Sequence, residues 1–162
     1  DASTYKRTLS NGTYKFKYNV LQLGYKYNGN DITACIGLVQ LGYLDEDNAR
    51  RRFLASLYNK YLDANKIKII KDTTYSECSQ HLYQVMVLDR DNIIIELNKI
   101  GIFPGVHYIS NYSYPLYSSF KGPSNESVAN RASNTLLSLP LHLCLLHDDI
   151  KYIANSLNEI IK

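Results

Sequence analysis

Residues 23–41 have the sequence LGYKYNGNDITACIGLVQL, in which a polar stretch with two tyrosines passes into a helical pattern. Asn30 stands where the side-chain oxygen of a helix N-cap is expected. From Asp31 to Leu44 apolar residues recur at helical spacing, and other apolar residues between them leave almost no polar side. The sequence therefore predicts a helix over residues 31–44 that is buried on most of its surface.

The residues that follow predict a second helix with a single apolar face, whose members are Phe53, Leu54, Leu57, Tyr58, Tyr61 and Leu62. Beyond it the chain alternates between strand-like and helix-like patterns. The predicted elements are strands at 66–71 and 82–88, a helix capped by Asp91 and ended by Gly101, a strand at 102–109, a surface loop at 110–122, a helix at about 125–137 and a final helix from Asp148 or Asp149.

Residues 1–24 are polar and rich in tyrosine, and the pair Asn11-Gly12 is a turn signal between short, weakly alternating segments. This pattern is typical of an extended arm or a hairpin. No internal repeat or second domain is visible. The sequence therefore predicts one domain of the α/β (α+β) class, a small sheet covered by helices with an extended N-terminal arm.

Composition and charge limit the classes of function. The chain has 162 residues, 45% of them hydrophobic, which is enough for a core of ordinary size. Its 18 basic and 15 acidic residues give a net charge of +3, too small and too evenly spread to indicate a nucleic-acid or membrane surface. Arg50, Arg51 and Arg52 are interpreted as a solvated helix face, with phosphate binding as the alternative.

Cysteine usage and the chain start indicate the compartment. Cys35, Cys78 and Cys144 are odd in number and form no Cys-x-x-Cys pair, so neither disulfides nor a metal site are expected. No run of about 18 apolar residues occurs, and the first residues are polar. We therefore expect a soluble, cytoplasmic protein. Because the sequence does not begin with Met, we also expect a fragment or processed product of a longer protein.

Several stretches resemble the C-terminal half of the DegT/DnrJ/StrS-type aminotransferases, pyridoxal-phosphate enzymes that place amino groups on nucleotide-linked keto sugars. Residues 23–41 are similar to the family's G-Y-K-Y-N-x-x-D-I-x-A-A-I-G-L-x-Q-L segment. Agreement in five places that keep the family's order argues against a chance origin. The four further matches are Asp1-Ala2 with Tyr5-Lys6-Arg7, Gln80-His81-Leu82-Tyr83, Ile100-Gly101-Ile102 with Gly105-Val106-His107-Tyr108, and Leu137-Ser138-Leu139-Pro140-Leu141.

The resemblance implies the small C-terminal domain of a fold-type-I aminotransferase, with residues 30–162 as that domain and residues 1–29 as an arm from the end of a large domain. The large domain carries the family's Gly-rich phosphate cradle, the Asp that pairs with the pyridine nitrogen and the Lys that forms the Schiff base. None of these motifs is recognisable here. The resemblance thus implies that this chain holds no catalytic residue and is inactive alone.

The resemblance also implies binding residues. Lys26 and Asn28 would reach the phosphate of the partner subunit's pyridoxal phosphate across a homodimer interface, although both could instead cap or solvate the following helix. His107, Tyr108 and Arg7 would contact the nucleotide-sugar substrate, which receives its amino group from an amino donor. The remaining histidines are expected to be structural or exposed. Four tyrosines could stack on the substrate or pack within their loop: Tyr108, Tyr112, Tyr114 and Tyr117.

Two other interpretations stay open. The chain could be a non-catalytic nucleotide-sugar or protein-binding module that keeps the same small-domain fold. It could also be a small α/β hydrolase or transferase outside the family, which ranks last because no Ser-His-Asp, paired-carboxylate or Gly-rich phosphate motif is visible. The resemblance favours amino transfer in sugar or polysaccharide biosynthesis.

Overall fold

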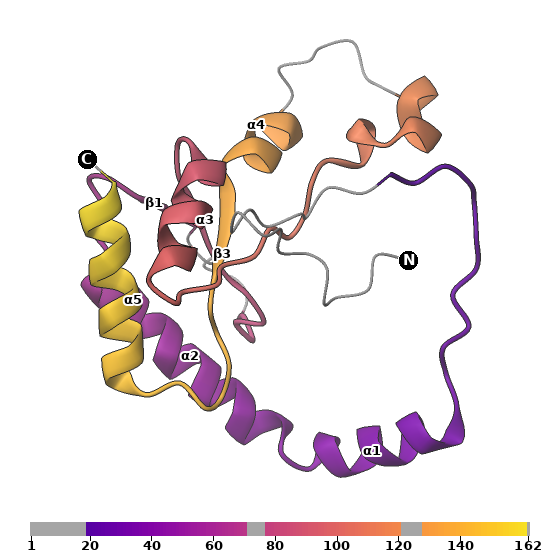
Figure 1. The fold of residues 1–162 in the computed structure, drawn as a ribbon. Coiled ribbons are helices and arrows are strands. Elements are labelled where there is room, and N and C mark those ends of the chain that lie inside the picture. Colours follow the sequence, from indigo (N-terminus) through magenta and orange to yellow (C-terminus); the bar gives the residue numbers. More distant parts are fainter. Residues whose placement is uncertain (1–18, 71–76, 121–127, 162) are drawn as a thin grey trace.

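The computed structural model describes residues 19–70, 77–120 and 128–161, which form helices around a small sheet (Figure 1). In this part of the chain, no helix is long and apolar enough to cross a membrane. In chain order the elements are α1 (Asp31–Leu41), α2 (Leu44–Tyr61), β1 (Lys68–Ile69), β2 (Tyr83–Met86), α3 (Arg90–Lys99), the 3₁₀ helices η2 (Asn111–Ser113) and η3 (Pro115–Phe120), α4 (Val128–Thr135), β3 (Leu136–Leu139) and α5 (His147–Ile160).

The three strands form one antiparallel sheet in the order β1-β2-β3. Val85 in the central strand pairs with Ile69 on one side and with Leu137 on the other. Along β2 the side chains alternate between buried and half-buried, as the period of two in a strand requires. Tyr83 and Val85 therefore face the core, while Gln84 faces the opposite side.

Helices α2, α3 and α5 pack together and supply most of the core. Tyr58 of α2 is fully buried, and its ring stacks on Tyr83 with 4.6 Å between the ring centroids. Burial raises the pKa of the Tyr58 hydroxyl above its ordinary value, so the hydroxyl stays protonated and donates a hydrogen bond of 2.8 Å to the carbonyl of Pro140. This contact ties α2 to the segment that follows β3.

The predicted helix at residues 31–44 exists, and its N-cap is confirmed. The Asn30 side chain accepts a hydrogen bond from the backbone N–H of Thr33 at 2.9 Å, and the Thr33 hydroxyl in turn accepts one from the backbone N–H of Asn30. The prediction that this helix is buried is wrong. No residue of α1 is buried, because the helix extends away from the sheet and no other described element packs on it (Figure 1).

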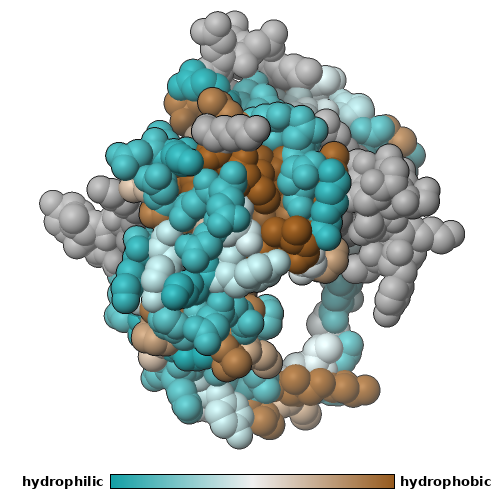
Figure 2. All heavy atoms as spheres, turned by 60° about the vertical axis from the view of Figure 1, so that its left-hand side comes forward, coloured by the Kyte–Doolittle hydropathy of each residue, from teal (hydrophilic) through white to brown (hydrophobic). Residues whose placement is uncertain are grey.

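The apolar side chains of α1 are consequently exposed to solvent. Ile32 is 75% exposed and Leu38 is 72% exposed. Figure 2 shows these hydrophobic side chains along the lower edge of the molecule, over α1. The composition of α1 is thus that of a covered helix, although the described residues do not cover it.

The second predicted helix and the final predicted helix are both present, as α2 and α5, and α5 begins one residue before the predicted Asp148. Helix α2 buries Leu54, Leu57 and Tyr58, as its apolar stripe indicates, although Phe53 remains 49% exposed. Helix α5 begins at His147, and the carboxylate of Asp149 accepts the backbone N–H of Leu146 at 2.8 Å. It buries Ile150, Ile153 and Leu157, with Ile160 half-buried.

The central part of the chain required corrections. The N-cap of α3 is Asp89, with a left-handed φ of 52°, and not Asp91, which lies in the first turn. Gly101 does end this helix, with a φ of 81° that glycine adopts without strain. The predicted strand at 102–109 is reduced to a single bridge between Gly105 and Ser138. In this antiparallel register the next hydrogen-bonded pair would join Phe103 to Pro140, and proline has no N–H to donate.

The helix predicted at 125–137 is shorter in the described residues and ends at Thr135, since the last apolar residues form strand β3 instead. Pairing with β2 outweighs the local helical pattern there. The predicted loop at 110–122 contains two short 3₁₀ helices in its described part. Of the predicted strand at 66–71, only the central residues Lys68–Ile69 form a strand, β1, and residue 71 lies outside the described residues.

Candidate functional site

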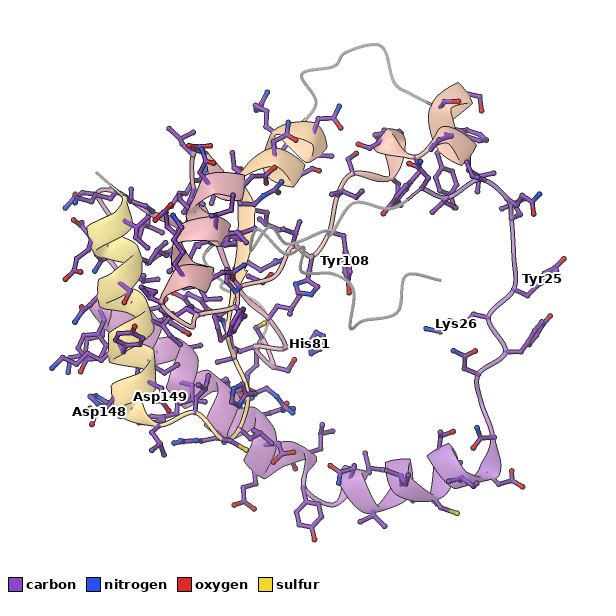
Figure 3. The ribbon with its side chains drawn as sticks, viewed as in Figure 1. Tyr25, Lys26, His81, Tyr108, Asp148 and Asp149 are labelled. Atoms are coloured by element: carbon purple, nitrogen blue, oxygen red, sulfur yellow. The ribbon has the colours of Figure 1, made fainter. Side chains whose placement is uncertain are left out.

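The candidate residues lie in two places. His107 and Tyr108 follow the Gly105 bridge beside β3, whereas Lys26 and Asn28 lie on the irregular segment before α1. In Figure 3, Lys26 points toward the side of the molecule that carries His81 and Tyr108, while Tyr25 points away. The described chain does not bring Lys26 or Asn28 into contact with His107. Arg7 lies outside the described residues.

Backbone pairing across three segments positions His107. Gln84 of β2 and Ser138 of β3 are directly opposite each other in the antiparallel register. On its other side, Ser138 exchanges two backbone hydrogen bonds with Gly105, of 2.9 and 2.8 Å. Because side chains repeat every two residues in extended chain, His107 lies on the same side as Gly105. The His107 ring thereby comes to lie against Ser138.

Side-chain hydrogen bonds complete this cluster. The His107 Nδ1 atom lies 3.0 Å from the Ser138 hydroxyl oxygen. The Gln84 amide nitrogen donates to the His107 carbonyl at 2.6 Å and to the Ser138 hydroxyl oxygen at 3.4 Å. Ser138 is only 3% exposed, so its hydroxyl depends on these protein partners. We call His107, Ser138 and Gln84 the histidine cluster.

Gly105 leaves the space that the imidazole fills. A Cβ atom added at Gly105 would stand 2.5 Å from Cε1 of His107, which is closer than any real Cβ contact. A side chain at Gly105 would therefore displace the ring. Glycine at this position thus leaves room for the His107 ring in its observed place.

The histidine cluster opens into a cleft of about 480 Å³. Tyr108 is not one of the residues that line this cleft; its side chain is 69% exposed, and its ring meets the His107 ring edge-on with 5.1 Å between centroids. An imidazole and exposed aromatic rings around a cleft suit a polar ligand with a flat or ring-shaped part. The other lining residues include Leu82, Asn98, Phe103, Pro104 and Leu141.

Desolvation lowers the pKa of His107 below its ordinary value of 6.5, and the nearby His81 lowers it further. His107 is thus neutral at pH 7. The folded chain binds this proton less tightly than the unfolded chain does. The resulting contribution to stability is therefore present above the unfolded pKa and is lost as the pH falls below about 6.5.

We expect the Cε1 proton of His107 to titrate below pH 6.5 in an NMR titration of the chain. The variant His107→Gln identifies the resonance, because the His107 signal is the one histidine signal that is missing from the spectrum of this variant. The folding free energy measured with denaturant at pH 7.5 and at pH 5.5 should differ less in this variant than in the wild type. A His107 midpoint at or above 6.5 would contradict the expected direction.

The irregular segment before α1, which carries Lys26 and Asn28, presents hydrogen-bond donors on one of its sides. Tyr25 and Tyr27 stack on each other, with 5.7 Å between ring centroids, and are 90% and 85% exposed. The two tyrosine side chains lie on one side of the extended chain. Side chains alternate in such a chain, so those of Lys26 and Asn28 lie on the opposite side. The segment thus presents an ammonium group and an amide together. Both groups donate hydrogen bonds, as a phosphate requires of its partners.

The remaining candidates are largely structural. Tyr114 is buried and packs within its loop, whereas Tyr112 is 39% exposed. Each of the three arginines of α2 has a partner: Arg50 donates to the Leu145 carbonyl, Arg51 pairs with Asp47 and Asn48, and Arg52 pairs with Glu77. All three arginines are half-buried, so they make structural contacts within the fold and do not form the fully solvated helix face that was expected.

Sequence reasoning missed Gln84, Ser138 and Gly105 as members of the site. Ser138 did lie within the quoted LSLPL run, and Gly105 within the stretch that contains His107. The signal that would join them is the pairing of β2 with β3, across 54 residues from Gln84 to Ser138. Nothing in the local pattern around Gln84 marks it.

Comparisons with known proteins agree with this fold. The model of the DegT/DnrJ/EryC1/StrS aminotransferase family matches residues 3–158. A UDP-4-amino-4,6-dideoxy-N-acetyl-beta-L-altrosamine transaminase from Campylobacter jejuni is 27% identical over 150 residues, which cover 89% of this chain and 40% of that protein. The chain thus spans about 40% of the length of this curated relative.

Solved structures of aminotransferases are also similar. Spr1654 from Streptococcus pneumoniae, described as a sugar aminotransferase, has a TM-score of 0.73 and 28% identity, over 90% of this chain and 38% of that one. It has been solved in apo, PLP and PMP forms. PseC from Helicobacter pylori, an aminotransferase of pseudoaminic acid biosynthesis, has a TM-score of 0.72 and 25% identity, over 90% of this chain and 41% of that one.

Proposed function

The chain belongs to the DegT/DnrJ/EryC1/StrS aminotransferase family, and we propose that it is the small C-terminal domain of an enzyme that aminates a nucleotide-linked keto sugar. The observation that carries this proposal is the family match over residues 3–158, together with the similar fold of sugar aminotransferases. The proposed cofactor is pyridoxal phosphate, since a similar protein has been solved in PLP and PMP forms. When bound, this cofactor accepts the amino group from a donor and passes it to the keto carbon.

Lys26 and Asn28 fit the phosphate of that cofactor. Their side chains are exposed and lie on the same side of an irregular segment, while the stacked Tyr25 and Tyr27 occupy the other side. An ammonium group and an amide N–H are both donors to phosphate oxygens. We propose that this segment crosses a homodimer interface and that the two side chains orient the cofactor held by the partner subunit.

His107 and Tyr108 are proposed to contact the nucleotide sugar. His107 lines the cleft beside β3, and the Tyr108 ring contacts the His107 ring. The neutral imidazole of His107 can form hydrogen bonds with sugar hydroxyl or phosphate oxygens. The exposed Tyr108 ring offers a surface for a sugar or base. Arg7 is proposed as a further contact to the diphosphate on the basis of its charge alone.

The group that performs the proton transfers of the reaction is proposed to lie outside these 162 residues. No lysine here stands in a segment that resembles the family's Schiff-base lysine, and the relatives are about two and a half times as long as the matched region. The chain alone is therefore expected to bind ligands without turning them over.

The test joins this chain to the N-terminal portion of the Campylobacter jejuni transaminase that it does not match; we call the product the joined protein. Amino transfer from L-glutamate to a UDP-linked 4-keto sugar is measured for the joined protein and for the chain alone. We expect transfer by the joined protein and none by the chain.

Circular dichroism and the absorbance of bound pyridoxal phosphate establish first that the joined protein is folded and loaded. A folded, loaded joined protein that transfers no amino group would contradict the proposed function. If the chain alone nevertheless bound UDP-sugars, that outcome would favour a non-catalytic binding module. Turnover by the chain alone would contradict the proposal that the proton-transferring group lies elsewhere.

A further inference from the structure

We propose that Ser138 and Gln84 are positioning residues that hold His107 in one tautomer, with the proton on Nε2, so that this N–H donates a hydrogen bond to an oxygen of the nucleotide sugar. The identity of the ligand rests on the proposed function above. The positioning itself rests on the geometry of the histidine cluster and can be tested without a ligand.

The orientation of the Gln84 amide is the first step. Its nitrogen lies 2.6 Å from the carbonyl oxygen of His107, and a carbonyl can only accept, so the NH₂ group must face it. The second hydrogen of the same NH₂ group is then available to the Ser138 hydroxyl oxygen at 3.4 Å. The Ser138 hydroxyl oxygen therefore accepts a hydrogen bond from the Gln84 amide.

The hydrogen of the Ser138 hydroxyl decides the tautomer. Ser138 is only 3% exposed, so a protein acceptor is favoured over solvent for this hydrogen. Among the described residues, the printed partners of the hydroxyl are the Gln84 amide nitrogen, which is a donor, and Nδ1 of His107 at 3.0 Å. Nδ1 must therefore accept the hydrogen. A neutral imidazole that accepts at Nδ1 carries its proton on Nε2.

The direction of Nε2 follows from the packing of the ring. The backbone bonds between Gly105 and Ser138 hold the two segments together, and the ring lies so close to Gly105 that no Cβ fits between them. In the described part of the chain, Nε2 has no hydrogen-bond partner, and no buried side-chain nitrogen there is left unsatisfied. Nε2 is therefore open to the cleft that His107 lines.

The ring is also held in its neutral form. Desolvation and the neighbouring His81 both lower the pKa of His107, so a second proton at Nδ1 does not compete with the Ser138 hydroxyl at neutral pH. A neutral ring with one fixed N–H distinguishes acceptor oxygens from donors. Phosphate and hydroxyl oxygens of a nucleotide sugar have that chemistry, whereas an ammonium group does not.

The first measurement is the tautomer of His107 in the ¹⁵N-labelled chain, by long-range ¹H–¹⁵N NMR at pH 7.5. We expect the Nε2–H form in the wild type and in Ser138→Thr, which keeps the hydroxyl. Ser138→Ala should shift the ring toward a mixture of tautomers. Ser156→Ala is the matched control, because Ser156 is a buried serine of α5 outside the cluster, and it should leave the tautomer unchanged.

A wild-type ring protonated on Nδ1 would overturn the proposal, and so would an unchanged tautomer in Ser138→Ala. If Ser138→Ala proved unfolded, Gly105→Ala supplies a second route. This variant keeps Ser138, but the added methyl group leaves no room for the His107 ring in its present place. The contact between Nδ1 of His107 and the Ser138 hydroxyl should therefore be lost. Retention of the wild-type tautomer and ring shifts in a folded Gly105→Ala protein would count against the geometry proposed here.

The second measurement titrates the joined protein with UDP, with UDP-N-acetylglucosamine and with N-acetylglucosamine. We expect the nucleotide ligands to shift the Nε2 resonance, and Ser138→Ala to weaken their binding by about 3- to 10-fold, the effect of one neutral hydrogen bond. A response to UDP assigns the acceptor to phosphate, and a response to N-acetylglucosamine assigns it to a sugar oxygen.

The two parts of the proposal fail in different ways. An Nε2–H tautomer that responds to none of the three ligands overturns the substrate contact, although the positioning by Ser138 stands. If the joined protein shows no amino transfer, but His107 keeps its Nε2–H tautomer and its resonance still responds to the ligands, the proposed function is overturned. The role of the histidine cluster then stands.

Discussion

Replacing Lys26 with alanine in the joined protein is expected to weaken the binding of pyridoxal phosphate by about 10- to 100-fold. This is the range for loss of one charge-assisted hydrogen bond to a phosphate. Lys26 lies on the side of its segment opposite the stacked tyrosines and points toward the body of the molecule (Figure 3). The measurement is the dissociation constant of the cofactor, followed by its absorbance.

The control for this variant is Lys68→Ala. Lys68 is an exposed lysine of β1, so the change removes the same charge from a different surface. Lys26→Arg should recover much of the affinity, since it restores the charge and the donors. Asn28→Ala should have a smaller effect, because its amide is neutral. Equal cofactor affinity in Lys26→Ala and Lys68→Ala would remove Lys26 from the phosphate site.

Elements that depend on local chemistry were predictable from the sequence. Asn30 caps α1 through a side chain and a backbone N–H three residues apart, and Gly101 ends α3 by adopting a positive φ. The amphipathic stripes of α2 and α5 likewise follow from residue spacing. In each case the information lies within a few residues of the element.

Elements that depend on distant pairing were not predictable in this way. Residues 136–139 belong to β3 because β2, some 50 residues earlier, offers an edge with which they pair. Read locally, their leucines continue the helical pattern of α4. The same pairing brings Ser138 beside Gln84 and Gly105. The resemblance to a family pointed to His107, but its surroundings were visible only in the folded chain.

The error over α1 has a different cause. Its sequence is apolar on nearly every side, which is typical of a helix that is covered by other parts of a protein. Burial, however, also depends on a partner, and the described residues provide none for α1. Since the chain spans about 40% of the length of a curated relative, we infer that the cover for α1 lies in the portion of such relatives that this chain does not match.

Two side-chain truncations of similar size, one in the core and one in α1, test this inference. In the chain alone, Leu157→Ala is expected to lower the free energy of unfolding by about 2–5 kcal/mol, because Leu157 is fully buried in α5 and its truncation leaves a cavity. Ile32→Ala removes a similar side chain from α1, but Ile32 is 75% exposed. Its effect should stay within about 0.5 kcal/mol. Urea unfolding followed by circular dichroism measures both.

The joined protein should change only one of these results. If the added portion covers α1, Ile32→Ala loses buried contacts there, and its cost should rise above about 1 kcal/mol. Leu157→Ala should cost about the same in both proteins, since its neighbours belong to this chain. An Ile32→Ala variant that remains neutral in a folded, cofactor-loaded joined protein would show that α1 stays exposed. In that case its apolar surface would need an explanation other than coverage by the aminotransferase itself.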